Sequence, residues 1–173
     1  MTITRRIAVA LTALAIAAPA ASAAFIPGTP GNDVLTGTAS HDRIVTRAGD
    51  DRVVALAGPD RVILGPGNDY AEGNEGRDRM FGGAGNDTLI GGADRDVLHG
   101  NAGDDTLEGG DGNDVLYAGF GRDTLVGGDG NDRLYSARHD ATPDSHDCGA
   151  GFDRAYVRPG DTTVNCEVVI PMP

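Results

Sequence analysis

The chain has 173 residues, with 27 glycines, no tryptophan, 26 acidic residues against 14 basic ones, and a formal net charge of −12. Aromatic residues make up only 5 % of the chain, which is too little large apolar surface for a layered globule and, at this charge, would ordinarily indicate disorder. Such an acidic surface excludes nucleic acid as a natural partner and favours cations.

The N-terminal segment has the three parts of a secretory signal peptide. Arg5 and Arg6 precede the apolar run from Ile7 to Ala18, and Ala21-Ser22-Ala23 supplies a cleavage site of small residues. The alternative is a membrane anchor, but the apolar run is short for the roughly 20 residues that span a bilayer. We expect residues 1–23 to be removed and the mature chain to be secreted, without a membrane span. The sequence does not distinguish Sec from twin-arginine export.

Internal repetition begins directly after this segment. From Gly28 to Tyr135 the chain consists of twelve consecutive nine-residue units without an insertion. The fourth position is glycine in ten units, with Ser40 and Asp94 as the exceptions. The eighth position is apolar in every unit, from Leu35 to Leu134. The sixth position is always aspartate: Asp33, Asp42, Asp51, Asp60, Asp69, Asp78, Asp87, Asp96, Asp105, Asp114, Asp123 and Asp132.

Each unit divides into a turn and a strand. The first six residues are turn-formers, among which glycine reaches positive φ and allows close backbone approach. The last three residues form a minimal strand whose middle side chain points to one face and whose neighbours point to the other. Two units close one coil, so residues 18 apart should stack, and the eighth-position side chains should lie between two parallel sheets. The expected fold is all-β.

The pattern Gly-Gly-x-Gly-x-Asp-x-hydrophobic-x resembles the RTX (haemolysin-type) calcium-binding nonapeptide repeat. Clean copies of the turn occupy residues 82–87, 109–114 and 127–132. The resemblance implies a calcium-loaded parallel β-roll over residues 24–135. The early units depart from the pattern, since Thr46, Ala55 and Leu64 replace the first glycine and Arg47 and Leu56 the second. Ion sites before about Asp60 are therefore expected to be weaker.

Calcium suits these turns because it takes six to eight oxygen ligands from carboxylates and backbone carbonyls. Two stacked turns can enclose an ion, so the natural carboxylate pairs are 18 residues apart, as in Asp87 with Asp105. The alternative is that the aspartates only cap their turns through hydrogen bonds to the backbone. The predicted calcium ligands are Asp60, Asp69, Asp78, Asp87, Asp96, Asp105, Asp114, Asp123 and Asp132, with Asp33, Asp42 and Asp51 as weaker ones. The predicted carbonyl ligands belong to Gly83, Gly85, Gly110, Gly112, Gly128 and Gly130.

The repeat register breaks after Tyr135, and we expect residues 136–173 to form a C-terminal cap. The polar stretch from Ser136 to Asp147, which contains His139, Asp140, Asp144 and His146, is interpreted as a solvated loop rather than a catalytic or metal site. Residues 148–156 form a degenerate thirteenth unit, and residues 164–170 a closing strand. Cys148 and Cys166 are the only cysteines, and in an exported chain they most simply form a disulfide.

The leading functional hypothesis is a secreted protein whose turns fold on binding multiple calcium ions. The alternative is an extracellular adhesin or matrix protein that calcium stiffens and that binds a surface glycan or a second copy of itself. An enzyme is not expected, because only four residues separate the predicted cleavage site from the repeats and fewer than 40 follow them. The sequence does not give the biological role, the oligomeric state, or the number and affinity of the calcium sites.

The outer face of one predicted sheet is a candidate contact surface. It carries an apolar and aromatic stripe, and exposed stripes of this kind often mark interfaces. The stripe consists of Val45, Ile63, Phe81, His99, Tyr117 and Tyr135, beside a column of Arg43, Arg61, Arg79, Val97, Val115 and Arg133. Two other interpretations stay open. Strand propensity alone could have filled these positions, or the C-terminal segment could fold back over them.

Overall fold

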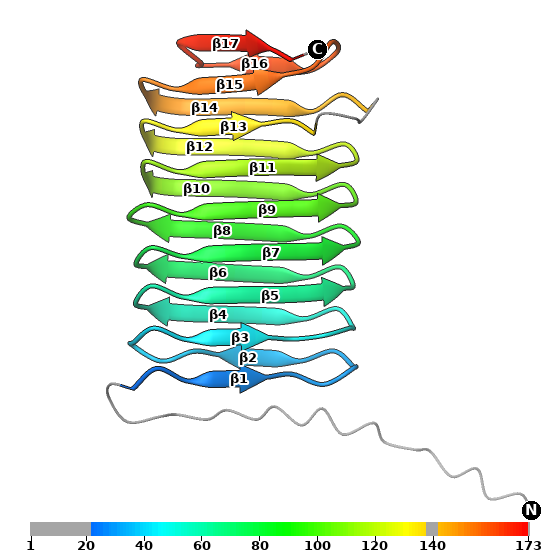
Figure 1. The fold of residues 1–173 in the computed structure, drawn as a ribbon, viewed down its shortest axis with the longest axis vertical. Coiled ribbons are helices and arrows are strands. Elements are labelled where there is room, and N and C mark those ends of the chain that lie inside the picture. Colours follow the sequence, from blue (N-terminus) through cyan, green and yellow to red (C-terminus); the bar gives the residue numbers. More distant parts are fainter. Residues whose placement is uncertain (1–21, 138–141, 173) are drawn as a thin grey trace, which may run out of the picture.

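The computed structural model describes residues 22–137 and 142–172. The predicted signal peptide falls almost entirely on residues 1–21, and it lies outside the described residues together with His139 and Asp140. Within the described ranges the chain forms 17 strands and no helix, and the strands stack into one elongated solenoid (Figure 1). In these same ranges we find no helix that could cross a membrane. The all-β prediction is confirmed.

The strands alternate between two sheets along the whole chain. They are β1 (Phe25–Pro27), β2 (Val34–Thr36), β3 (Arg43–Val45), β4 (Arg52–Ala57), β5 (Arg61–Pro66), β6 (Tyr70–Glu75), β7 (Arg79–Ala84), β8 (Thr88–Ala93), β9 (Val97–Ala102), β10 (Thr106–Gly112), β11 (Val115–Phe120), β12 (Thr124–Gly130), β13 (Arg133–Tyr135), β14 (Ser145–Gly151), β15 (Arg154–Val157), β16 (Thr162–Val164) and β17 (Val168–Pro171). Odd-numbered strands form a nine-stranded sheet and even-numbered strands an eight-stranded one.

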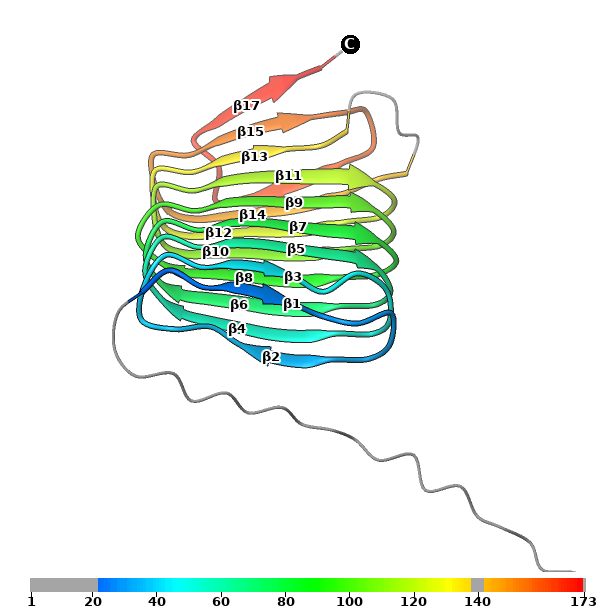
Figure 2. The same cartoon turned by 60° about the horizontal axis from the view of Figure 1, so that its bottom comes forward.

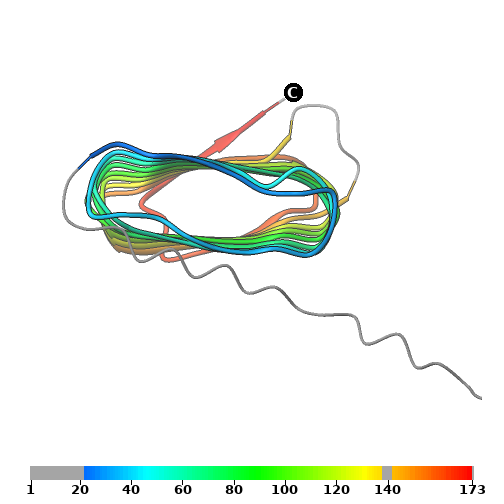
Figure 3. The same cartoon turned by 90° about the horizontal axis from the view of Figure 1, so that it is seen from below.

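Neighbouring strands within each sheet are parallel, and residues 18 apart are paired. Thr106 lies beside Thr124 in the even sheet, and Arg61 lies beside Arg79 in the odd sheet. The two sheets face each other as two layers (Figure 2), and a view along the stack shows a flattened ring (Figure 3). The predicted parallel β-roll with two units per coil is therefore confirmed.

The central strands are longer than the three residues expected from the sequence. Strands β4 to β12 contain six or seven residues, because the first positions of the following unit also pair with the coil next to them. Gly110, for example, lies beside Gly128 in the same register as the strand that precedes it. Pairing between coils thus continues through the first part of each glycine-rich segment, although the second residue there has a positive φ, as in Gly110 (104°).

The core lies between the two sheets and takes its large apolar side chains mainly from the eighth position of each unit. The eighth-position side chains from Ile44 to Leu134 are fully buried, and Leu35 packs against them at the N-terminal end. First-position side chains also face inward, as Ala55, Leu64 and Ala118 show. One large apolar side chain in most units, with mostly small first-position residues beside it, explains how so few large hydrophobic residues support the fold.

The C-terminal segment continues the roll, which corrects the expected loop. Strand β14 pairs with β12, and His146 lies beside Leu125, 21 rather than 18 residues away. Both Asp144 and His146 are buried, so the solvated-loop interpretation is wrong for these two residues. The unit at residues 148–156 is consequently the fourteenth one, not the thirteenth, because a longer thirteenth unit precedes it.

The end of the chain differs from the single closing strand predicted over residues 164–170. The segment is divided between β16 in the even sheet and β17 in the odd sheet, with Asn165 at positive φ between them. The predicted disulfide between Cys148 and Cys166 is present. It joins the buried first position of the fourteenth unit to the connection between the last two strands, so the final coil is covalently attached to the stack.

Candidate calcium sites

The sixth-position aspartates form two hydrogen-bonded ladders, one on each edge of the roll. In each rung the carboxylate Oδ1 accepts the backbone N–H of the aspartate one coil earlier, as Asp105 does from Asp87 at 2.8 Å. The first edge, which leads into the even-numbered strands, carries Asp33, Asp51, Asp69, Asp87, Asp105, Asp123 and Asp144. The second edge carries Asp42, Asp60, Asp78, Asp96, Asp114, Asp132 and Asp153. The ladder places all these carboxylates in register inside the turns.

The second carboxylate oxygen has no hydrogen-bond donor at most of these positions. Among the described residues, Oδ2 is buried without a donor in Asp51, Asp60, Asp69, Asp78, Asp87, Asp96, Asp105, Asp114, Asp132 and Asp153. A buried anionic oxygen without a partner is costly, and it is stabilised by a proton or by a cation. The repetition of this feature in coil after coil is the property that a row of cation sites requires.

Asp33 and Asp42 differ from the others, because protein donors satisfy both of their oxygens. The backbone N–H of Thr29 donates to Asp33 Oδ2 at 2.6 Å, and the Thr29 hydroxyl donates to Oδ1 at 3.1 Å. Thr38 makes the corresponding bonds to Asp42. Threonine at the second position of the unit thus makes these two aspartates turn caps, which fits their placement among the weaker predicted ligands. Asp51, the third of that group, has an unpaired Oδ2 instead.

Carbonyl oxygens converge on the unpaired carboxylates where the first position is glycine. A Cβ added to Gly82 would lie 2.3 Å from Asp87 Oδ2 and 2.7 Å from the carbonyl oxygen of Gly100. The corresponding carboxylate and carbonyl oxygens flank Gly73, Gly91, Gly100, Gly109 and Gly127, at 2.2–2.6 Å and 2.3–2.6 Å from an added Cβ. A carboxylate and a carbonyl oxygen together are the donor set that calcium prefers. In three earlier units the first position carries a buried side chain, which fills the space between these two oxygens. The side chains are Thr46 beside Asp51, Ala55 beside Asp60 and Leu64 beside Asp69.

The predicted carbonyl ligands lie where successive coils approach each other closely. Gly83 and Gly85 have φ values of 129° and 117°, and a Cβ on Gly83 would lie 2.0 Å from the carbonyl oxygen of Gly65. Gly110, Gly112, Gly128 and Gly130 repeat this stacking. Within the described residues there is no cluster of three or more His, Cys, Asp or Glu side chains around one point. An ion in these turns would therefore depend on backbone oxygens as well as on aspartate.

Burial changes the protonation of the ladder. Burial raises the pKa of five of these aspartates to about 7: Asp60, Asp78, Asp87, Asp105 and Asp132. The hydrogen bond from the backbone N–H of the aspartate one coil earlier lowers the pKa, but its effect is smaller. The pKa of Asp96 is raised to about 8, by burial first and then by the negative charges of Asp78, Asp114 and Asp94. At neutral pH these carboxylates are therefore partly protonated, and a divalent cation could replace the protons.

Four residues of the C-terminal segment continue the ladders and were missed as candidate ligands. Asp144 and Asp153 accept the N–H groups of Asp123 and Asp132, and Asp161 and Glu167 accept those of Asp144 and Asp153. The turn at residues 148–153 carries the signal in Gly149, Gly151 and Asp153. No signal in the repeat spacing identifies Asp144, because the longer thirteenth unit shifts this residue out of the nine-residue register.

Comparison with known proteins agrees with this geometry. The model of the RTX calcium-binding nonapeptide repeat family, which comprises four copies of the repeat, matches residues 27–62, 63–98 and 99–134. No curated protein matches the chain significantly. The three matches are contiguous and cover more than half of the chain. The chain therefore belongs to the RTX calcium-binding nonapeptide repeat family.

Proposed function

We propose that this protein is a secreted, non-catalytic module that binds several calcium ions and completes its folding when they bind. The observation that carries the proposal is the row of buried Oδ2 atoms without a donor, repeated from Asp51 onward on both edges. The proposed ligands are Asp60, Asp69, Asp78, Asp87, Asp96, Asp105, Asp114, Asp123 and Asp132, with turn carbonyls completing each shell. Membership of a calcium-binding repeat family supports the choice of ion.

The sites are graded along the roll in this proposal. They are strongest where glycine at the first position leaves the carboxylate and carbonyl oxygens open, as at Asp87 and Asp105. Asp33 and Asp42 contribute least, because threonine donors already use both of their oxygens. Magnesium fits poorly, since it demands a small octahedral shell and keeps its waters.

A calcium titration of the mature chain followed by circular dichroism tests this function. With chelator the chain should be largely disordered, and β-structure should appear as calcium reaches millimolar concentrations. Magnesium at the same concentration serves as the control and should produce little folding. The same β-content with and without calcium would refute the coupling of binding to folding.

The second candidate function is a calcium-stiffened extracellular scaffold that binds a glycan or a second copy of itself. The surface relevant to this function is the outer face of the odd sheet, which carries a continuous stack of rings from Phe81, His99, Tyr117, Tyr135 and Tyr156. Ring centroids are 4.3–4.9 Å apart, and adjacent planes are within 15° of parallel. The C-terminal segment extends this column with Tyr156 rather than covering it.

The stacking favours a structural role for the column over ring-face binding of a sugar. Each internal ring has both faces covered by its neighbours, and Arg61 lies over the Phe81 ring at 5.2 Å. Replacing Phe81 and Tyr117 with Ser in calcium-loaded protein tests the contact surface directly. If the face binds a partner, the variant should lose self-association or retention on cell-wall material while it stays folded. Unchanged association would leave the stack as a stiffening element only.

A further inference from the structure

The fifth-position residues distinguish the two edges of the roll. On the first edge they form a second hydrogen-bonded ladder beside the aspartates, in which a side-chain oxygen accepts the N–H group of the fifth residue one coil later. The donors and acceptors are Asp50 to Asn32, Asn68 to Asp50, Asn86 to Asn68, Asp104 to Asn86 and Arg122 to Asp104, at 2.8–3.0 Å. This ladder satisfies the backbone at the outermost point of each turn.

The second edge lacks this ladder over four coils. Its fifth residues there are His41, Pro59, Arg77 and Arg95, none of which has a side-chain oxygen. The ladder resumes only where Asn131 donates to Asn113 at 2.9 Å. Within residues 22–137 and 142–172, nothing accepts the backbone N–H of Arg77 or Arg95. Two N–H groups are therefore left at the rim of this edge, each next to its own guanidinium group.

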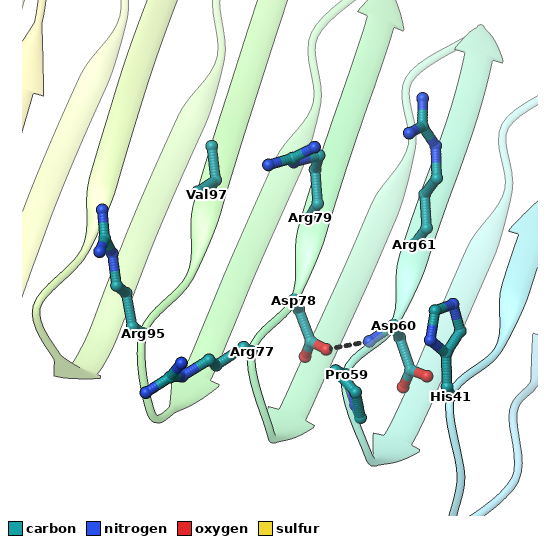
Figure 4. Close-up of a pocket in the computed structure, with 9 residues that line it drawn as sticks. All are labelled: His41, Pro59, Asp60, Arg61, Arg77, Asp78, Arg79, Arg95 and Val97. Carbon is teal, nitrogen blue, oxygen red and sulfur yellow. Dashed lines mark hydrogen bonds between the residues drawn. The ribbon is translucent and has the colours of Figure 1, made fainter.

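A groove of about 540 Å³ on the second edge is lined by the four fifth-position residues His41, Pro59, Arg77 and Arg95. Arg61 and Arg79, which are paired across β5 and β7, form its other side. Figure 4 shows that the side chains of Arg61, Arg77, Arg79 and Arg95 extend away from the carboxylates of Asp60 and Asp78. Those two carboxylates are 3 % and 2 % exposed, whereas all four arginines are exposed. The accessible charge of the groove is thus positive.

No salt bridge uses these arginines within the part of the chain that the structure describes. This is unusual in a protein with 26 acidic residues and 14 basic ones, where a carboxylate partner should be easy to find. A guanidinium group offers a planar set of donors that matches carboxylate, sulfate and phosphate groups, and adjacent backbone N–H groups add donors of the same kind. A volume of this size is typical of sites for small ligands or for a few sugar units.

We propose that the second-edge groove, lined by Arg61, Arg77, Arg79 and Arg95, binds a ligand that carries sulfate, phosphate or carboxylate groups. The ligand is either a free oxyanion or an anionic glycan chain, and the two share the chemistry that the groove recognises. Asp60 and Asp78, which are proposed calcium ligands, also line this groove, but their carboxylates are buried, whereas the arginines that would bind the anion are exposed and are not calcium ligands. A glycan chain as the ligand would give the roll the binding partner of an extracellular scaffold.

A competing account is that Arg77 and Arg95 compensate the buried charge of Asp78 and Asp96, their neighbours in the chain. In that case the arginines would act in place of a cation, and they would bind no external ligand. The two accounts differ in what the loss of the arginines changes. Ligand binding changes under the proposal, and the calcium requirement for folding changes under the alternative.

The test uses the mature protein in millimolar calcium, with folding checked by circular dichroism before binding is measured. Binding of dextran sulfate, free sulfate and neutral dextran is measured by calorimetry at physiological ionic strength, because these sulfate probes avoid the precipitation of calcium by phosphate. The variant is Arg77→Gln with Arg95→Gln. The matched control is Arg122→Gln with Arg133→Gln, which removes the same charge at exposed fifth and seventh positions outside the groove.

The groove variant should weaken binding of the sulfated probe about tenfold or more, as loss of two charge-assisted donor groups predicts, while the control stays close to the parent protein. Competition by free sulfate would identify a small-ion site, and binding of the polymer alone would identify a glycan site. Equal losses in both variants would show non-specific attraction and overturn the proposal. So would a failure of the parent to bind either sulfate probe, or a variant that changes only the calcium requirement.

Discussion

Asp105 accepts the backbone N–H of Asp87 through Oδ1 at 2.8 Å, while its Oδ2 lies buried without a donor. One carboxylate therefore has two separable roles, of which the first joins neighbouring coils and the second is free for a cation. The same division recurs in the other unpaired aspartates of both edges. An aspartate-to-asparagine change separates the two roles, because it keeps the Oδ1 acceptor and removes the charge.

Asp105→Asn should reduce the calcium response of the protein much more than Asp42→Asn. The amide oxygen still accepts the N–H group of Asp87. The second carboxylate oxygen is replaced by an NH₂ group, which carries no negative charge and cannot act as an oxygen ligand for calcium. We expect the calcium concentration at the folding midpoint to rise about tenfold, or about 1.4 kcal/mol, for the Asp105 variant. Asp42→Asn is the matched control, since Thr38 already occupies both oxygens of Asp42. Equal shifts in the two variants would show that the sites are not graded by their turns.

Metal-free protein should be more ordered at pH 5 than at pH 7.5. Burial raises the pKa of Asp87 and Asp105 from 3.8 to about 7, so the folded chain holds protons in this window that the unfolded chain has released. The contribution of these carboxylates to the stability of the metal-free roll is then fully present below about pH 4 and is lost as pH rises through about 7. Circular dichroism of calcium-free protein across this range measures the effect. Calcium should abolish most of the difference, and a metal-free chain whose β-content rises with pH would contradict the assignment.

Reduction of the disulfide between Cys148 and Cys166 should loosen the C-terminal cap before the central coils. The bond closes a loop of 18 residues, for which chain entropy predicts a stabilisation of about 3 kcal/mol. Hydrogen exchange in calcium-loaded protein should accelerate in β14 to β17 after reduction and change little in β6 to β11. Uniform acceleration along the whole roll would show that the disulfide supports all coils equally. Two free thiols in protein secreted under oxidising conditions would show that the bond is absent from the exported form.

Leu56→Gly should stabilise the roll by about 1 kcal/mol, because leucine at this position is held in a left-handed conformation that costs roughly 1–3 kcal/mol. Leu56 has a φ of 80° and is 39 % exposed, so little packing is lost with its side chain. Asn74→Gly is the control, since Asn74 has a φ of 76° and asparagine tolerates this region well. Thermal unfolding in saturating calcium measures both changes. A loss of stability in the Leu56 variant would mean that contacts of its side chain outweigh the strain.

Much of the fold could be predicted from spacing alone. The constant nine-residue interval predicts the alternation of strands between two sheets, and it also predicts that Asp87 lies next to Asp105. The apolar eighth position identifies the core in the same way, from Ile44 to Leu134. Periodic sequences allow this because each coil contacts only its neighbours, so local pattern and global structure coincide.

The remaining features depend on contacts that spacing does not encode. The capping of Asp33 by Thr29 is a choice between two local hydrogen-bond patterns, and only the structure resolves it. Asp144 re-enters the ladder through a unit of different length, which no fixed interval can detect. The rings of His99 and Tyr117 were expected in one column, but their face-to-face stacking was not, since it depends on side-chain rotamers.

Because successive units alternate between the two sheets, the sheet on which a residue lies depends on whether an odd or an even number of units precedes it. Removal of residues 82–90 alone would move His99 to the opposite sheet and Arg95 to the opposite edge, which would divide both the aromatic column and the arginine groove. Removal of two successive units would return every later residue to its original side. The longer unit that contains Asp144 keeps the same alternation, since β14 still pairs with β12 in the even sheet. The roll can therefore lengthen or shorten without exchanging its faces only by whole coils of two units, which are 18 residues long in the regular part of the stack.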